Sequence, residues 1–200
     1  MSNNGVDRRR LALLGGLAWA ASGLLGEAQA QSAAASSVSD LPAEVTTHHT
    51  IELAGRTLRF AATAGALPLQ GENNAPRAEL AFIAFQLDGA DALHRPVTFA
   101  FNGGPGFASA WLNIGAVGPW RMSLAADAIA ASASPETIPN AETWLDFTDL
   151  VFIDPAGTGY SRVLDTSDHV RRRLFSVEGD IAYLAEAIRH WLDRSDRTRA

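Results

Sequence analysis

Residues 97–111, VTFAFNGGPGFASAW, decide the fold, because a short apolar run breaks there into glycines and a proline before small residues resume. Val97, Phe99 and Phe101 predict a buried β-strand, since β-branched and aromatic side chains fit a sheet that is covered on both faces. The glycines predict a tight turn, and residues 108–115 have helical character. We interpret the stretch as a strand, a turn and the start of a helix.

The turn Asn102-Gly103-Gly104-Pro105-Gly106 can expose main-chain N–H groups, because glycine has no side chain to cover them. Such amides at the carboxyl end of a strand can bind an anion or a developing oxyanion. A dinucleotide-binding loop would have a third glycine where Ser109 stands, and a phosphate loop would need a lysine, which the chain lacks. A purely structural turn stays open at this point.

Alternating and continuous apolar patterns predict the other elements. Residues 45–53 alternate and predict a half-buried strand, which residues 57–63 and 79–87 continue into an antiparallel meander. The continuous apolar run at residues 150–153 predicts a second buried strand. Apolar residues spaced by three and four predict an amphipathic helix over residues 176–194, with Ser176 as its N-cap. This order of elements predicts an α/β fold in which an antiparallel meander leads into a parallel sheet with helices.

The N-terminus has the features of an export signal. Arg8-Arg9-Arg10 precedes an apolar run over residues 11–25, and Ala28-Gln29-Ala30 fits a small-x-small cleavage site. The arginines also resemble a twin-arginine signal. We therefore expect the protein to be exported, to the periplasm or as a secreted protein.

The signal defines three parts of the chain. We expect residues 1–30 to be removed, residues 31–44 to form a flexible lead and residues 45–200 to form the folded domain. We expect no stable membrane anchor, because the apolar run is too short to span a bilayer comfortably.

Composition excludes several classes of partner. The net charge is -6 and the arginines are scattered, so we expect no nucleic acid partner. The cluster Arg171-Arg172-Arg173 is interpreted as a solvated flank before the helix. The chain has no cysteine, which excludes disulfides. We expect neither a metal nor a cofactor.

Two further features of the sequence belong together. The first motif is the glycine turn with a later Gly-Pro pair, and the second combines an asparagine, a tryptophan and an aspartate with a glycine-containing segment. The residues are Asn102, Gly103, Gly104, Pro105, Gly106, Gly118, Pro119, Asn140, Trp144, Asp154 and the segment PAGTGYS at residues 155–161. Together these motifs resemble the serine carboxypeptidase family, in its exported bacterial branch, and the likeness runs from about Thr47 to the end of the chain.

The resemblance implies an α/β-hydrolase fold and removal of C-terminal residues from peptides by a Ser, Asp, His triad through an acyl-enzyme. It assigns an oxyanion-hole amide to Gly104, and binding of the substrate's terminal carboxylate to Asn102 and Gly103. Ala100 and Ala116 stand where better-known members have a tryptophan and a glutamate of the carboxylate-binding network. Acyl transfer or ester hydrolysis therefore stays open.

The chain lacks the G-x-S-x-G motif that carries the nucleophile in this fold. Ser109 and Ser161 are interpreted as structural or cleft-lining residues. By family resemblance the nucleophile would follow Ala200. We therefore expect an incomplete domain, truncated before the nucleophile and inactive alone, with a peptide as the substrate of the complete enzyme. The alternative is a non-catalytic exported fragment that acts as a binding or assembly module.

The same resemblance places the strand of residues 97–101 between the strand of residues 150–153 and the strand that would carry the nucleophile. Without that second neighbour the strand has an unpaired edge, which favours aggregation or strand addition. We expect residues 31–200 alone to be poorly soluble or only partly folded.

Overall fold

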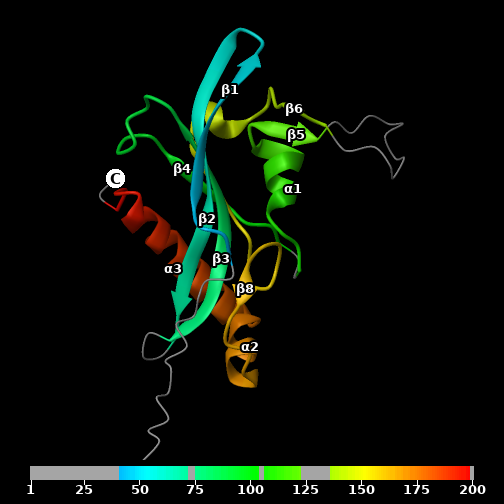
Figure 1. The fold of residues 1–200 in the computed structure, drawn as a ribbon, viewed down its shortest axis with the longest axis vertical. Coiled ribbons are helices and arrows are strands. Elements are labelled where there is room, and N and C mark those ends of the chain that lie inside the picture. The colour runs from blue at the N-terminus through cyan, green and yellow to red at the C-terminus, as the bar shows by residue number, and fades with distance from the viewer. Residues whose placement is uncertain (1–40, 72–74, 104–105, 123–135, 199–200) are drawn as a thin grey trace, which may run out of the picture. The chain divides into compact units, whose positions relative to one another are not determined.

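A computed structural model of the protein describes residues 41–71, 75–103, 106–122 and 136–198. The expected export signal, residues 1–30, and most of the expected lead lie outside these ranges. Within them the chain forms an α/β fold on a six-stranded mixed sheet, which Figure 1 shows between helices. The predicted class is confirmed, because an antiparallel meander leads into a parallel pair of strands.

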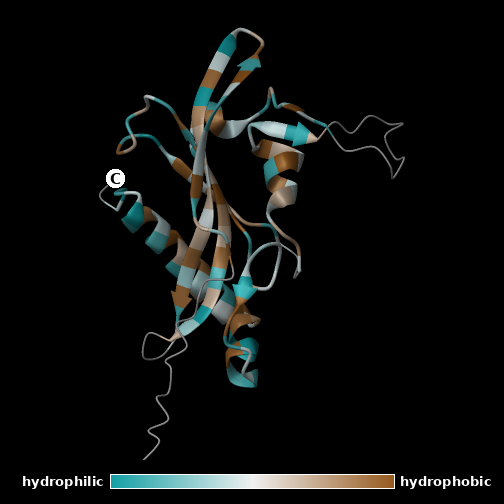
Figure 2. Ribbon diagram, in the orientation of Figure 1, coloured by the Kyte–Doolittle hydropathy of each residue, from teal (hydrophilic) through white to brown (hydrophobic). Residues whose placement is uncertain are grey.

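The first three strands form the antiparallel meander. They are β1 (Val45–Leu53), β2 (Arg56–Gln70) and β3 (Pro76–Leu87), and Figure 2 shows hydrophilic and hydrophobic residues alternating along them. β2 runs well past its predicted end, through Gly65 and Pro68, which argue against a central strand. They are tolerated because β1 pairs with β2 only as far as Ala64, so the rest of β2 is bonded to β3 alone.

A buried strand joins the meander to the parallel pair. β7 (Asp149–Ile153) pairs with β3 in the antiparallel sense and with β4 (Val97–Ala100) in parallel. All five residues of β7 are buried, as its continuous apolar pattern predicts. The sheet order is β1-β2-β3-β7-β4, and a short strand, β8 (Arg162–Val163), pairs with the start of β3. In the described part of the chain, β4 has no partner on its other side.

One face of the sheet is covered by α3 (Val177–Arg194), close to the predicted helix. The hydroxyl oxygen of Ser176 accepts a hydrogen bond from the N–H of Gly179 at 3.0 Å, so the predicted N-cap is confirmed. Near the other end of the helix, the ring of Trp191 meets that of Phe99 edge-on at 5.4 Å between centroids. α3 therefore packs against β4 as well as the meander.

The other face is covered by irregular structure. The segment predicted as a helix is a single turn, α1 (Ala110–Leu112), followed by a π-helix, η2 (Asn113–Val117). After it come a hairpin, β5 (Trp120–Met122) with β6 (Thr137–Pro139), and a 3₁₀ turn, η3 (Trp144–Asp146). Trp120 packs edge-on against the rings of Phe60 and Phe85 in the core of this face.

The sequence reading missed a second helix, α2 (Asp168–Leu174). Its N-cap is Ser167, whose hydroxyl accepts the N–H of Val170 at 3.4 Å. The arginine cluster at residues 171–173 lies in the last turn of α2 and is exposed, so it is part of a helix and not a flank before one. None of the described helices is long and apolar enough to cross a membrane.

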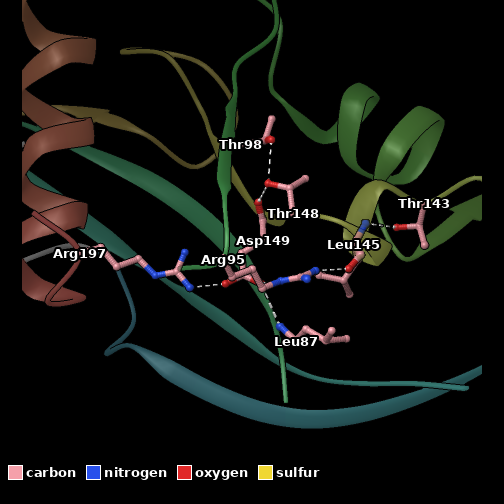
Figure 3. Close-up of polar contacts among 8 residues, drawn as sticks. All are labelled: Leu87, Arg95, Thr98, Thr143, Leu145, Thr148, Asp149 and Arg197. Carbon is pink, nitrogen blue, oxygen red and sulfur yellow. Dashed lines mark hydrogen bonds and ion pairs between the residues drawn. The ribbon is translucent and has the colours of Figure 1, made fainter. Parts of the chain in front are cut away.

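A buried carboxylate links distant parts of the sheet (Figure 3). Oδ1 of Asp149 accepts hydrogen bonds from Nε of Arg95 at 2.8 Å and from the N–H of Leu87 at 3.0 Å. Oδ2 accepts one from Nη2 of Arg197, whose side chain is also buried. Two guanidinium groups therefore neutralise this carboxylate, which a buried charge requires.

Candidate active site at the carboxyl ends of β4 and β7

Two loops leave the sheet at the same edge. β4 and β7 are parallel neighbours, so the glycine loop (residues 101–109) and the loop of residues 154–161 both begin at carboxyl ends of strands. Ligands of α/β proteins bind at this edge of a parallel sheet. The structure thus brings together the two motifs that the sequence singled out.

Asp154 ties the two loops together. Its Oδ1 accepts the N–H of Ser109 at 2.8 Å, and its Oδ2 accepts the N–H of Tyr160 at 3.1 Å. Gly159, the residue before Tyr160, has a φ of +49°, and a Cβ on it would stand 2.0 Å from Oδ2 of Asp154. Only glycine leaves room for the carboxylate in this arrangement. Asp154 belonged to the recognised motif, but its contacts could not be read from the sequence.

The two serines near these loops make structural hydrogen bonds. The hydroxyl of Ser109 donates to the carbonyl of Ile153 and accepts the N–H of Asn102 at 3.1 Å. The hydroxyl of Ser161 donates to the carbonyl of Asp154 at 2.7 Å and accepts the N–H of Ala81 at 2.9 Å. Neither hydroxyl is bonded to a histidine among the described residues. A nucleophilic serine needs an adjacent base, so this geometry supports their structural interpretation.

The structure describes the bonds and exposure of Asn102 and Gly103 in the glycine loop, but it does not describe Gly104. The N–H of Asn102 is already bonded to Ser109, and its side-chain amide donates to the carbonyl of Gly103 at 3.1 Å. Gly103 is exposed, and a Cβ there would meet no atom within 4 Å. Gly104, the expected oxyanion donor, lies outside the described residues. The roles of Asn102, Gly103 and Gly104 therefore stay predictions.

Asn140 supports the segment that follows the glycine loop. It is fully buried, and its side-chain amide donates to the carbonyls of Ala116 at 2.7 Å and Gly118 at 2.9 Å. Thr143 adds a hydrogen bond from its hydroxyl to the carbonyl of Val117 at 3.0 Å. These bonds satisfy carbonyls at the end of the π-helix η2, which would otherwise lack partners. Asn140 of the second motif therefore caps the C-terminal end of η2 with its side-chain amide.

Tyr183 anchors the second loop from the helix side. Its hydroxyl donates to Oδ1 of Asp180 and accepts the N–H of Ala156 at 3.3 Å. Burial, and then the bond to Asp180, raise the pKa of Tyr183 above its ordinary value. The second loop is therefore joined to the glycine loop through Asp154 and to α3 through Tyr183.

A cavity of about 490 Å³ lies beside the loops, between α1 and the sheet. Ser109, Asp154, Gly159 and Tyr160 form its wall on the loop side. Most of the rest is apolar surface from the segment at residues 41–43, from β1, β2, β3 and β7, and from Ala108, α1 and η2. Sequence reasoning missed this cavity, because its walls come from segments far apart in the chain. No three His, Asp or Glu side chains of the described residues lie close enough to hold a metal ion.

Comparison with known proteins identifies one family. The family model of the serine carboxypeptidases matches residues 57–198, a span that runs from β2 to the end of the described chain and includes both loops. No curated protein matches the sequence.

Proposed function

Because the chain belongs to the serine carboxypeptidase family, we propose that it forms part of a serine-type carboxypeptidase, which removes C-terminal residues from peptides through an acyl-enzyme. Within that enzyme the chain contributes the oxyanion loop and part of the substrate cleft. The observation that carries the proposal is the meeting of the two motif loops at the carboxyl ends of β4 and β7, joined by Asp154.

The glycine loop would act through its main chain. In this proposal the N–H of Gly104 donates to the oxyanion that forms when a carbonyl is attacked, while Asn102 and Gly103 bind the substrate's terminal carboxylate. Donors that are already in place stabilise the charge without reorganising, and loss of one such donor costs about a hundredfold in rate. The two bonds of Ser109 support this role, because they fix the end of the glycine loop to Ile153 at the end of β7 and to Asp154, the residue that follows.

The triad would come from sequence that is not among these 200 residues. The gene should therefore encode, in frame or after a frameshift beyond codon 200, a G-x-S-x-G motif followed by an aspartate and a histidine. We expect the 200-residue chain alone neither to hydrolyse blocked dipeptides nor to react with a fluorophosphonate probe. Stoichiometric labelling of Ser109 or Ser161 would contradict this assignment.

Substrate acids and esters test the role of the glycine loop in the completed enzyme. If Asn102 and Gly103 bind a carboxylate, kcat/KM should be higher for a blocked dipeptide with a free C-terminus than for its methyl ester or amide. Asn102→Ala should reduce that preference and leave ester hydrolysis less affected. Equal rates for the acid and the ester would favour an esterase or acyltransferase. That activity is the alternative because Ala100 and Ala116 replace two residues of the family's carboxylate-binding network.

Export is proposed from the N-terminal residues. A processed protein that begins at Gln31 in the periplasmic or culture fraction would support it, and an unprocessed protein in the cytoplasm would contradict it.

The open edge of β4 favours a second candidate, a non-catalytic exported module that another chain completes by strand addition. The gene sequence separates the two, because a module of this kind would be followed by a genuine stop codon with no elbow motif nearby.

A further inference from the structure

The outer edge of β1 is a second open edge of the sheet. The strand order begins at β1, so in the described part of the chain no strand pairs with it on the side away from β2. Natural proteins usually blunt such an edge with proline, lysine or a bulge. β1 contains no proline and no lysine, and its register with β2 runs from end to end without a shift. The edge is therefore open to another strand.

The main chain of Thr50 points outward from this edge. Thr50 lies opposite Arg59 of β2, and the carbonyl of Arg59 accepts the N–H of Asp88, the residue after β3. Arg59 therefore directs its main-chain groups toward β3 and away from Thr50. Because opposite residues of an antiparallel pair exchange both hydrogen bonds or neither, the N–H and the carbonyl of Thr50 are left for a strand outside. His48 and Glu52, two residues to either side, have the same orientation.

The side chains of these residues are complementary to their own copies. Thr46, His48, Thr50 and Glu52 share one face of β1, and all four are exposed. In an antiparallel pair of β1 strands centred on Thr50, His48 of each strand lies opposite Glu52 of the other. A pair centred on His49 would set His48 opposite Thr50, and one centred on His48 would set two histidines together. Opposite charges across a strand pair stabilise it, so the register centred on Thr50 is favoured.

Both groups of this pairing keep an atom for a second copy. Nδ1 of His48 lies 3.5 Å from Oδ1 of Asp88, and its side chain is 72% exposed, which leaves Nε2 on the other side of the ring. Oε2 of Glu52 accepts the hydroxyl of Thr57 at 2.6 Å, which holds the carboxylate on this face and leaves Oε1 for another donor. The contacts within one chain therefore position the two side chains and do not use them up.

We propose that β1 is a dimerisation edge, whose partner is β1 of a second copy in antiparallel register about Thr50. The two sheets then continue into one another through main-chain hydrogen bonds. β4 and β7, whose carboxyl ends carry the candidate active site, lie at the other end of the strand order. The pairing thus uses a different edge from the candidate site and does not depend on the proposed function.

Single thiols test the register, because the chain has no cysteine of its own. In the dimer the two copies of residue 50 form a hydrogen-bonded pair with Cα atoms about 5.5 Å apart, within the range of a disulfide. Residue 46 lies opposite residue 54, so its two copies are about 27 Å apart. In dilute solution with oxidised glutathione, the Thr50→Cys chain should give at least about tenfold more disulfide-linked dimer than Thr46→Cys, which changes another exposed threonine of β1.

A matched pair of substitutions at one position tests the main-chain bonds. Thr50→Pro removes an outward N–H, which an edge strand tolerates because no bond to β2 is lost. It removes the two symmetric bonds at the centre of the dimer, so the dissociation constant from sedimentation equilibrium should rise at least about tenfold. Thr50→Val keeps the N–H and the branched side chain and should change the constant by less than about twofold. Circular dichroism of both variants checks that the sheet is intact.

Two results would overturn the proposal. One is cross-linking that is equal at positions 50 and 46, or absent from both. The other is a dissociation constant that Thr50→Pro and Thr50→Val change alike, which is what association through the open edge of β4 would give. Neither result bears on the carboxypeptidase proposal, because no hydrolysis is measured.

Discussion

At the scale of single residues, the candidate site depends on side chains that serve the main chain. Asp154 accepts two N–H groups, Asn140 donates to two carbonyls, and Ser109 bridges Asn102 to β7. The sequence identified these residues as members of motifs. It could not show their bonds, because the partners are far apart in the chain. Asn140 meets Ala116 only when β5 pairs with β6, and Asp154 meets Ser109 only when β4 pairs with β7.

Asp154→Asn should loosen both loops. An asparagine can accept one of the two N–H groups but presents its own NH₂ to the other, so we expect a loss of about 1–3 kcal/mol in the free energy of unfolding. Hydrogen exchange at the amides of Ser109 and Tyr160 should become faster. Asp88→Asn, on an exposed turn residue, is the control and should change stability by less than about 0.5 kcal/mol. Unchanged exchange at both amides would contradict the role assigned to Asp154.

Tyr183 predicts a loss of stability at alkaline pH. Its pKa is raised in the folded protein, whereas in the unfolded chain it titrates near the ordinary value of about 10. Below that pH both states keep the proton and stability does not change. As the pH rises above it, the unfolded chain ionises first, so the free energy of unfolding should fall by up to about 1.4 kcal/mol per pH unit.

The composition makes this measurement clean. The chain has no lysine and no cysteine, and its only other tyrosine is Tyr160, which is exposed. Urea unfolding between pH 9 and 11 should therefore show the fall in the wild type and in Tyr160→Phe, and not in Tyr183→Phe. A fall of the same slope in Tyr183→Phe would assign the effect to another group.

At the scale of elements, periodicity and capping residues predicted those strands and helices that local interactions stabilise. The strand at residues 45–53 and the helix from residue 177 lie where their periodicity and cap predict them. The second half of β2 escaped prediction because an edge position, and not the residues themselves, makes Pro68 acceptable. The π-helix η2 escaped it because Asn140 and Thr143, from a later segment, satisfy its last carbonyls.

The cap of α3 is a prediction that belongs to this scale. Ser176→Ala removes the acceptor of the N–H of Gly179 and should lower the free energy of unfolding by about 1 kcal/mol. Ser195→Ala, at the other end of the same helix, is the matched control, because no hydrogen bond of its hydroxyl is seen in the described part of the chain. Equal effects of the two substitutions, measured by urea unfolding in dilute solution, would show that the cap contributes nothing specific.

At the scale of the whole molecule, the sheet formed by the described residues ends on β4, a short strand whose side chains join the hydrophobic cores on both faces. The α/β class of the molecule, and β7 as the strand beside β4, were predictable from the apolar runs and the family likeness. The cavity was not predictable, since no local pattern encodes a space between α1 and four strands, β1, β2, β3 and β7.

The edge of β4 predicts how the chain behaves in solution. Residues 31–200 should associate and become poorly soluble as concentration rises, with apparent mass in size-exclusion chromatography with light scattering rising in step. A monomer whose mass stays constant up to high concentration would contradict this.

The buried bond between Arg197 and Asp149 has a consequence for synthesis on the ribosome. Arg197 is synthesised 48 residues after Asp149. Until its guanidinium is present, Oδ2 of the buried Asp149 carboxylate lacks this hydrogen-bond partner. Nascent chains arrested before codon 197 should therefore be more sensitive to protease than those arrested far enough beyond it for Arg197 to leave the exit tunnel. The bonds of this buried carboxylate would thus be completed only after Arg197 has left the ribosome.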